Sequence, residues 1–534
     1  MLARYLKHSS RIIERSLGGP SLRGYAVAPQ AQEQINDSSS SAEALENARP
    51  YSELSGPSAY EVIRGFLPGG EFHNKLFTEG IIELSLRYGD IFRFPAMFGK
   101  PEMVMNLNPA DYPIIFRNEG IWPQRRSFET SNYHREVHRA DFFQGVTGLV
   151  TTAGEDWAKF RTAVNPVLMQ PKNARLYLNT ILEINDEFLE RIRHIRDPHT
   201  LEMPDDFHDD LNRLTLEGVV GIALNKRLGM LHKNRDSPEC KLLLQSIRNF
   251  FDYSEDLEIN PSIWKIVKTP TFYKLMKSLD TLTEICNKYI DEALKKLEQD
   301  KDGKLTTEVG KEKSVLEKLL RIDRKIAVVM ALDMMAAGVD TTSSALTGIL
   351  FCIAKNPDKQ QKLFEELKRV LPHKDSQLTI ESMQNLPYLR ACIKEGLRYH
   401  PVIPGTMRRL PNDVVLSGYR IPAGVDISIS SNLILRNEKF VVEPNKYIPE
   451  RWVRNDPEGR KYHIENPFLF LPFGFGPRSC VGKRIVDLEL EVTLARLVRN
   501  FVIEFNYSTE KAFIPKIVFI PGIPLNFKFE ERRE

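Results

Sequence analysis

One loop near the carboxyl end constrains the folding and chemistry of this chain more than any other stretch. Residues 473–482 read Phe-Gly-Phe-Gly-Pro-Arg-Ser-Cys-Val-Gly, and the apolar periodicity after them predicts a helix from Gly482 to Arg499. Cys480 therefore stands where the first N–H groups of a helix could stabilise a thiolate, the form of cysteine that binds metals. A lone cysteine is more often an inert core residue, and this is the alternative interpretation.

The residues around Cys480 suit a flat, negatively charged ligand. Gly474 and Gly476 allow the backbone to approach such a ligand closely, and Arg478 could pair with an anionic group such as a propionate. The 5 cysteines are scattered and include no Cys-x-x-Cys pair, so the sequence predicts neither a disulfide framework nor a zinc site. No His-Glu-x-x-His pair supports a zinc hydrolase.

The whole pattern Phe-x-x-Gly-x-Arg-x-Cys-x-Gly resembles the haem-binding loop of the cytochrome P-450 superfamily, the haem-thiolate monooxygenases. The resemblance implies haem b (iron protoporphyrin IX) as the cofactor. It also implies that Cys480 is the axial ligand of the haem iron and that Phe473 and Arg478 lie beside the cofactor. A thiolate ligand pushes electron density onto the iron and favours cleavage of O2, the implied co-substrate.

Residues 324–355 predict one long apolar helix that ends at Asn356-Pro357. The run is long enough to span a bilayer, but its polar residues would be costly in lipid, so a buried core helix fits better. Its centre, Ala-Gly-Val-Asp-Thr-Thr at 337–342, resembles the oxygen-activation motif of the family. Thr341 could bond a carbonyl one turn back, and Asp340 could relay protons for general-acid catalysis. A merely polar kink is the alternative.

The resemblance next implies a buried ion network. Glu395 and Arg398 lie three residues apart in a helix that Pro387 opens and Pro401 closes. In the family such a Glu-x-x-Arg pair joins an arginine from a later Pro-Glu-Arg segment, which is Arg451 here. The three charges are expected to fix the scaffold of the haem loop.

Further side chains could hold the haem propionates. Trp157 and Arg161 are spaced to share a helix face, and the resemblance implies that they contact a propionate. A core tryptophan with a surface arginine is the alternative. The resemblance also places a propionate-binding arginine among the later strands, at Arg408, with Arg409 as the fallback.

The N-terminal residues predict a targeting sequence and not a folded element. Residues 1–25 carry five basic residues (Arg4, Lys7, Arg11, Arg15 and Arg23) against one acid and contain no long apolar run. This composition is typical of a mitochondrial transit peptide, although a disordered basic tail is the alternative. Residues 26–57, rich in serine, predict a flexible lead-in, and residues 58–534 the monooxygenase domain.

A second group of basic residues predicts the branch of the family. Arg390 and Lys394 lie four apart just before Glu395, and mitochondrial members use a pair at this spacing to dock an acidic ferredoxin. Lys483 and Arg484 add positive charge beside Cys480, which suits electrostatic steering of an acidic donor. Solvated surface residues are the alternative. The chain resembles insect mitochondrial members of the twelfth family.

The resemblance implies a mainly α cytochrome P-450 fold, with a large helical lobe, a smaller β-rich lobe, and haem between the long central helix and the Cys480 loop. Alternation within 88–106 predicts a β-hairpin, whereas 175–225 and 277–300 predict long helices. Aromatic residues at 250–251, 263–264 and 272–273 indicate either internal packing or, by resemblance, a lid that touches a membrane.

The expected reaction inserts one oxygen atom of O2 into a small lipophilic substrate. Electrons would come from NADPH through a ferredoxin reductase and an acidic [2Fe-2S] ferredoxin of the adrenodoxin type, on the matrix side of the inner mitochondrial membrane. Family likeness favours a xenobiotic. A steroid or ecdysteroid-type hormone hydroxylase, a ferredoxin-independent haem-thiolate isomerase and a non-enzymatic haem or lipid carrier are the alternatives. The net charge of +3 gives no reason to expect nucleic acid.

Overall fold

The computed structural model describes residues 38–73, 75–126, 128–232, 237–260, 262–302, 314–454 and 456–533. The chain divides into two compact units, Met1–Ala48 and Arg49–Glu534. The first unit contains helix α2 (Ser38–Asn47), and the transit peptide expected at residues 1–25 lies outside the described residues. The second unit contains the remaining described elements and is treated below.

Helices make up most of the second unit, as the resemblance implies. The α-helices are α3 (Ala59–Phe66), α4 (Phe77–Tyr88), α5 (Tyr112–Arg117), α6 (Glu129–Tyr133), α7 (Ala140–Phe143), α8 (Gly148–Thr151), α9 (Gly154–Leu168), α10 (Pro171–Arg175), α11 (Leu178–Ile195), α12 (Phe207–Leu224), α13 (Pro238–Ser254), α14 (Pro270–Asp302), α15 (Val315–Leu320), α16 (Arg324–Lys355), α17 (Pro357–Val370), α18 (Ile380–Gln384), α19 (Pro387–Tyr399) and α20 (Lys483–Asn500). Shorter 3₁₀ and π turns are η3 (Tyr51–Glu53), η4 (His134–His138), η5 (Glu255–Ile259), η6 (Ser431–Ile434), η7 (Pro449–Trp452), η8 (Arg460–Tyr462) and η9 (Gly476–Arg478).

The strands form one larger sheet and three two-stranded ladders. They are β1 (Ile91–Phe94), β2 (Met103–Asn106), β3 (Thr406–Arg409), β4 (Val414–Leu416), β5 (Tyr419–Ile421), β6 (Asp426–Ile429), β7 (Phe501–Glu504), β8 (Phe513–Pro515), β9 (Phe519–Pro521) and β10 (Lys528–Glu531). The larger sheet has the order β1-β2-β6-β3, with β2 parallel to β6 and the other pairs antiparallel. The β1–β2 hairpin confirms the expectation for 88–106.

Helix α16 is the centre of the helical part. The side chain of Asp323 accepts hydrogen bonds from the N–H groups of Lys325 and Ile326 and so caps the helix start. The helix ends where Pro357 follows, because the residue before a proline disfavours helical backbone. Among the described residues, α16 alone is long and apolar enough to cross a membrane. It packs against α12, α14 and α19, so it is a core helix.

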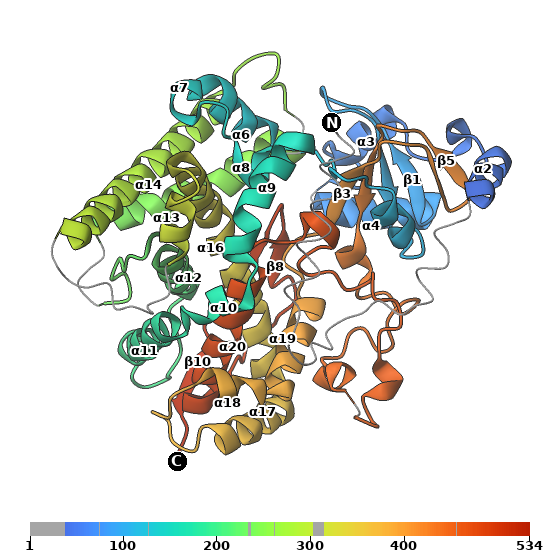
Figure 1. Cartoon of the computed structure of the whole chain (residues 1–534). Helices are drawn as coiled ribbons and strands as arrows, with labels where there is room; N and C mark the ends of the chain where they lie inside the picture. The colour runs from blue at the N-terminus through green and yellow to red at the C-terminus, as the bar shows by residue number, and fades with distance from the viewer. Residues whose placement is uncertain are drawn as a thin grey trace, which may run out of the picture. The chain divides into compact units, whose positions relative to one another are not determined.

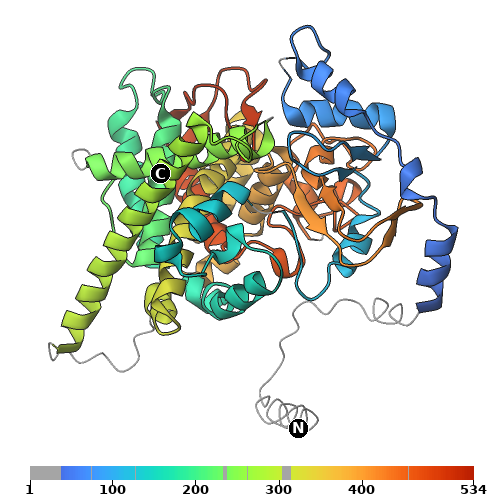
Figure 2. The same cartoon turned by 90° about the horizontal axis from the view of Figure 1, so that it is seen from above.

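The β-rich part lies beside the helical part. Figure 1 shows α3 and α4 next to β1 and β3, apart from the helices that surround α16. In Figure 2 the long yellow-green helix α14 runs at the left, and the blue and orange strands of the sheet lie at the right. Separate clusters of buried apolar side chains fill the two parts, around Leu350 in the first and around Phe92 and Ile427 in the second. This arrangement confirms the expected mainly α fold with a smaller β-rich lobe.

The expected flexible lead-in differs from the structure over residues 38–57. Residues 38–47 form α2, and the chain from Arg49 onward packs against the β-rich part. The guanidinium of Arg49 lies 3.7 Å over the ring of Tyr419, and Leu54 is buried. A cation over an aromatic face and a buried leucine fix a segment whose serine and proline content alone predicts a loop.

The aromatic residues for which the sequence left open either internal packing or a lid that touches a membrane are mostly core residues. The rings of Trp264 and Phe272 are buried and stack with centroids 5.5 Å apart. The Lys268 ammonium lies 4.7 Å from the first ring centroid and 4.5 Å from the second. These two rings therefore do not face a membrane, because each has protein partners on its faces.

Candidate active site

The loop before Cys480 is shaped by two glycines with left-handed backbone. Gly474 has φ +70° and Gly476 φ +69°, a region that residues with a Cβ rarely adopt. A Cβ on Gly476 would also lie 2.8 Å from an oxygen of Glu119. The backbone N–H of Cys480 donates to the carbonyl of Phe473 at 2.8 Å, which closes the loop. The geometry thus presents one thiol at the start of α20.

Cys480 differs from the other cysteines in its accessibility. Its side chain is exposed, whereas Cys240, Cys286, Cys352 and Cys392 are buried. Surrounding protein atoms raise the pKa of the Cys480 thiol, while hydrogen bonds from the N–H groups of Gly482 and Lys483 lower it. Exposure separates Cys480 from the core cysteines, and the backbone donors would favour the thiolate that a metal ligand requires.

The expected pair on α9 is buried next to this loop. Trp157 and Arg161 are both buried, so the alternative of a surface arginine is wrong. The Arg478 guanidinium lies 3.8 Å from the centroid of the Trp157 ring and donates to the carbonyls of Thr152 and Pro123. The structure therefore brings Arg478, Trp157 and Arg161 together around Cys480, as the resemblance implies.

The structure separates the two candidate arginines of β3. Arg408 is buried, donates to Glu119 and donates to the carbonyl of Phe475 at 3.2 Å, so it belongs to the Cys480 loop. Arg409 instead makes two bonds of 2.9 Å to Asp426 on β6. Neighbouring strand residues point to opposite faces, which is why only Arg408 reaches the loop.

Arg125 is a fourth arginine at this site that the sequence did not single out. Its pKa is lowered to about 10 by burial and by the charges of Arg408 and Arg161. The pKa of Arg478 is lowered to about 8 by burial and by repulsion from the same group of cations. Arg125 follows Trp-Pro-Gln in a loop, and no local spacing links it to Cys480.

These residues fit the implied cofactor. Arg478 is repelled by the three other arginines, and the carboxylate of Glu119 attracts only two of the four, Arg408 and Arg478. Two propionates would relieve that repulsion. Nε of Arg161 is buried without a hydrogen-bond partner in the described part of the chain. One accessible cysteine also matches the single thiolate that holds haem iron in monooxygenases.

The oxygen-activation motif has the geometry that the sequence predicts. The Thr341 hydroxyl donates to the carbonyl of Ala337 at 2.6 Å, the bond one turn back that was expected. Ala337 is exposed although most of α16 around it is buried, so this turn presents an open face. Asp340 is buried, and desolvation raises its pKa to about 6, with Arg248 opposing and Asp252 and Asp209 adding to the rise.

The ion network is present as expected. Arg398 makes bonds of 2.8 and 2.9 Å to the two oxygens of Glu395, and Arg451 donates to Glu395 at 3.0 Å. All three side chains are fully buried. Trp452 adds a bond of 2.8 Å from its ring N–H to Glu395, a contact that the sequence does not predict. Arg398 and Arg451 also donate to backbone carbonyls of Leu435, Lys446 and Tyr462, which lie upstream of the Cys480 loop.

Two of the four expected docking residues form ion pairs within the protein. Lys394 is exposed by surface area, but desolvation by neighbouring protein atoms and the charges of Lys483 and Arg390 lower its pKa. Arg390 pairs with Glu491 at 3.0 Å, and Lys483 pairs with Asp487 at 2.6 Å. Arg484 is exposed. The surface is therefore basic, with two of its charges partly neutralised by α20.

A turn upstream of α9 is tied to two helices by its basic residues. His134, His138 and Arg139 contact the carboxylate of Asp280 on α14 at 3.1, 3.0 and 3.0 Å. Arg135 of the same turn donates to Asp333 on α16 at 2.8 Å. A Cβ on Gly148 would lie 2.5 Å from an oxygen of Asp333, so only glycine fits there.

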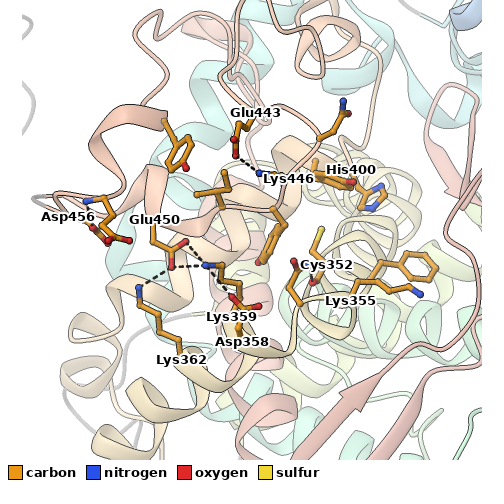
Figure 3. A pocket seen from close by; sticks show the side chains of 18 of the residues that line it. Cys352, Lys355, Asp358, Lys359, Lys362, His400, Glu443, Lys446, Glu450 and Asp456 are labelled. Carbon is orange, nitrogen blue, oxygen red and sulfur yellow. Dashed lines mark hydrogen bonds and ion pairs between the residues drawn. The ribbon is translucent and has the colours of Figure 1, made fainter.

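A separate cavity of about 850 Å³ lies away from these residues (Figure 3). It is lined from the end of α16, from α17 and from residues 443–462, and its charges pair with one another. Lys362 and Lys359 contact Glu450 at 2.9 and 3.4 Å, and Lys446 contacts Glu443 at 3.0 Å. It contains none of the residues around Cys480.

A cysteine loop framed by arginines, together with a core helix that has an open Ala-Gly-x-Asp-Thr turn, is the arrangement of haem-thiolate oxygenases. The family model named Cytochrome P450 matches residues 61–528, and the chain belongs to this family. Members bind haem b and use O2 in monooxygenation, so the protein is an oxidoreductase.

Three of the most similar relatives belong to one subgroup of the cytochrome P450 family, the twelfth family. The chain is 49% identical over 493 residues to cytochrome P450 CYP12A2 of Musca domestica, covering 91% of this chain and 92% of that protein. It is 49% identical over 492 residues to probable cytochrome P450 12e1, mitochondrial, of Drosophila melanogaster, covering 92% and 94%. A further relative of that fly, probable cytochrome P450 12a5, mitochondrial, is 47% identical over 91% of each chain. These names support a mitochondrial location and confirm the expected likeness to the twelfth family.

Proposed function

We propose that this cytochrome P450 oxidises a small lipophilic substrate, with a xenobiotic favoured over a steroid-type hormone precursor, and takes its electrons from an acidic [2Fe-2S] ferredoxin. NADPH and a ferredoxin reductase would reduce that ferredoxin. The observation that carries the proposal is the basic surface formed by Lys394, Arg390 and Lys483 beside the Cys480 loop. Likeness to mitochondrial relatives supports a donor of this type.

In this proposal the chain holds the haem through Cys480 and the surrounding cations. Arg161, Arg408, Arg478 and Arg125 bind the propionates, and the Trp157 ring positions Arg478. Phe473 accepts the N–H of Cys480 and so fixes the thiolate. When bound, the haem supplies the redox chemistry that places one oxygen atom of O2 in the substrate.

Asp340 and Thr341 move the protons that this reaction consumes. A carboxyl with a pKa near 6 gains and loses its proton close to neutral pH, which suits a relay. Arg248 and Asp209 form an ion pair of 2.7 Å that is partly exposed, and both influence Asp340, so protons enter from this surface. Thr341 sits on the open turn and orients the last donor.

A reconstituted assay tests the electron donor. Lys394→Glu is expected to slow reduction of the holoenzyme by a reduced acidic ferredoxin about tenfold at low salt, because it reverses a charge on the docking surface. Lys277→Glu, on exposed α14, is the matched control and should leave the rate unchanged. Equal effects of the two changes, or a rate that is independent of salt, would contradict the proposal.

The same assay separates the alternatives. A ferredoxin-independent isomerase would turn over without reduced ferredoxin, and a carrier would bind haem and lipid without consuming O2. Ligand-induced change in the haem absorbance spectrum, screened over xenobiotics and steroids, identifies the substrate class. Tight binding of steroids alone would favour the hormone-hydroxylase alternative.

Peripheral contact with the matrix face of the inner membrane is part of the proposal. Ile263, Ile266 and Val267 are exposed on one loop, Ile266 to 85%. Apolar side chains beside lysines suit the headgroup boundary of a bilayer. Ile266→Glu is expected to reduce co-sedimentation of the holoenzyme with phospholipid vesicles, and unchanged co-sedimentation would contradict this contact.

A further inference from the structure

Glu489 on α20 is a buried carboxyl group with no charged partner. It occupies a slot against α12, where a Cβ on Gly218 would lie 2.2 Å from its Oε1, so the slot exists only because that residue is glycine. Neither carboxyl oxygen has a hydrogen-bond partner in the described part of the chain. Burial alone raises the pKa of Glu489 to about 8. A carboxyl in such surroundings stays neutral at pH 7 and carries one O–H donor.

A small cavity joins Glu489 to helix α16. Its volume is about 20 Å³, above the roughly 10–15 Å³ that one water molecule needs. The lining comes from four helices, α11, α12, α16 and α20, and Glu489 is the one ionisable side chain in it. The hydroxyl of Thr342 in this lining is buried and, like Glu489, lacks a hydrogen-bond partner among the described residues.

We propose that this cavity binds one structural water that bridges the carboxyl of Glu489 on α20 to the hydroxyl of Thr342 on α16. The carboxyl O–H donates to the water, and the water donates to the Thr342 oxygen or accepts from its hydroxyl. Each of the two buried polar groups then gains a hydrogen-bond partner. Without the water, both groups would remain desolvated and unpaired, which costs free energy. A buried water normally makes about three such bonds.

The bridge makes Glu489 a positioning residue for the site. Helix α20 begins at the Cys480 loop, and Thr342 directly follows Thr341, so the bridge links the two helices on which the thiol and the Asp340-Thr341 turn depend. Direct packing of α16 on α20 already exists, and the bridge adds a directional contact at the level of Thr341. The inference does not depend on which substrate or electron donor the protein uses.

Infrared spectroscopy of the holoenzyme at pH 7 in deuterated water tests the bridge. A protonated-carboxyl band that disappears in Glu489→Gln is expected. Thr342→Val, which removes only the hydroxyl, should shift that band, since a bonded partner of the water is lost. The matched control is Thr347→Val on the same helix, whose hydroxyl already donates to Ser343 and which should leave the band in place. Absence of the Glu489 band, or a band that ignores Thr342→Val, overturns the proposal.

A double-mutant cycle provides a second readout in case one variant folds poorly. Glu489→Gln and Thr342→Val should each change the unfolding equilibrium constant. The change in the double variant should be smaller than the product of the two single changes, by a factor of about three or more. A high-resolution crystal structure should show water density between the two side chains. Multiplicative effects, or a cavity without water density, would overturn the bridge.

Discussion

The guanidinium of Arg478 lies 3.8 Å from the centroid of the Trp157 ring. This contact joins the Cys480 loop to α9 across most of the length of the chain, and it holds Arg478 where it also donates to the Thr152 carbonyl. A cation that is stacked and hydrogen-bonded in this way has little freedom, so its position relative to the thiol is fixed before any cofactor binds.

Removal of the Trp157 ring tests that contact. Trp157→Ala is expected to speed loss of haem from the holoenzyme about 2- to 30-fold, the equivalent of a buried cation–π contact of ~0.5–2 kcal/mol. Transfer of haem to an apo-globin acceptor measures the rate. Trp157→Phe should keep most of the effect of the native ring, and Trp122→Ala, at an exposed tryptophan, should leave the rate unchanged.

Replacement of Cys480 tests the iron ligand. Cys480→Ser is expected to abolish the thiolate-type carbon-monoxide spectrum of the reduced protein, because a serine oxygen cannot supply the same electron density. The absorbance difference spectrum measures this. Cys286→Ala, at a buried cysteine, is the control and should keep the spectrum. Persistence of the spectrum in the Cys480 variant would refute the assignment.

Loss of the Glu395 charge tests the network. Glu395→Gln leaves two buried arginines without their carboxylate and is expected to lower the free energy of unfolding by about 3–5 kcal/mol. Denaturant titration of the holoenzyme measures the change. The control Glu365→Gln lies on the exposed face of α17 and should have an effect within about 0.5 kcal/mol. Similar stability of the two variants would contradict a buried network.

The pH dependence of stability tests the neutral state of Glu489. Its pKa is about 8 in the folded chain, above the ordinary value of 4.5, so the folded state binds the proton more tightly. The stabilisation from this proton is complete below about pH 4.5 and declines as pH rises towards 8. Glu489→Gln removes the dependence, so its stability relative to the native chain should rise by several kcal/mol between pH 5 and pH 8. Parallel stability curves for the two proteins would contradict the assignment.

The basic turn at 134–139 gives a local prediction. Asp280→Asn removes the carboxylate that His134, His138 and Arg139 contact, so amide hydrogen exchange of residues 134–143 should speed up about tenfold, without a similar change in α16. Glu284→Gln is the matched control, because Glu284 is largely exposed and its contact with Arg139 is long, at 3.8 Å. Equal exchange in both variants would show that Asp280 does not hold the turn.

Local spacing predicted a large part of the site. Glu395 and Arg398 share a helix face because they are three residues apart, and Thr341 bonds the carbonyl of Ala337 because hydroxyl side chains in helices reach back one turn. The bounds of α16 also followed from its apolar run and the proline after it. These are properties of short stretches of sequence, so they can be predicted without the tertiary structure.

Contacts between segments that are distant in the chain could not be predicted from local spacing. Arg125 and Glu119 join the site from loops whose local sequence does not predict it. The bond from Trp452 to Glu395 depends likewise on segments that are distant in the chain. Burial decided between the two interpretations of Trp264 and Phe272, which stack inside the protein. Arg49 and Leu54 pack in a segment that was expected to be a flexible lead-in.

The sequence by itself determined the family, the thiol at Cys480 and the helices that flank it, because each depends on residue types at short, fixed spacing. Only the tertiary structure decided which charges are paired, which are buried, and which of Arg408 and Arg409 faces the loop. The physical reason is that pairing and desolvation depend on which segments the fold brings together, and these segments lie hundreds of residues apart in the chain.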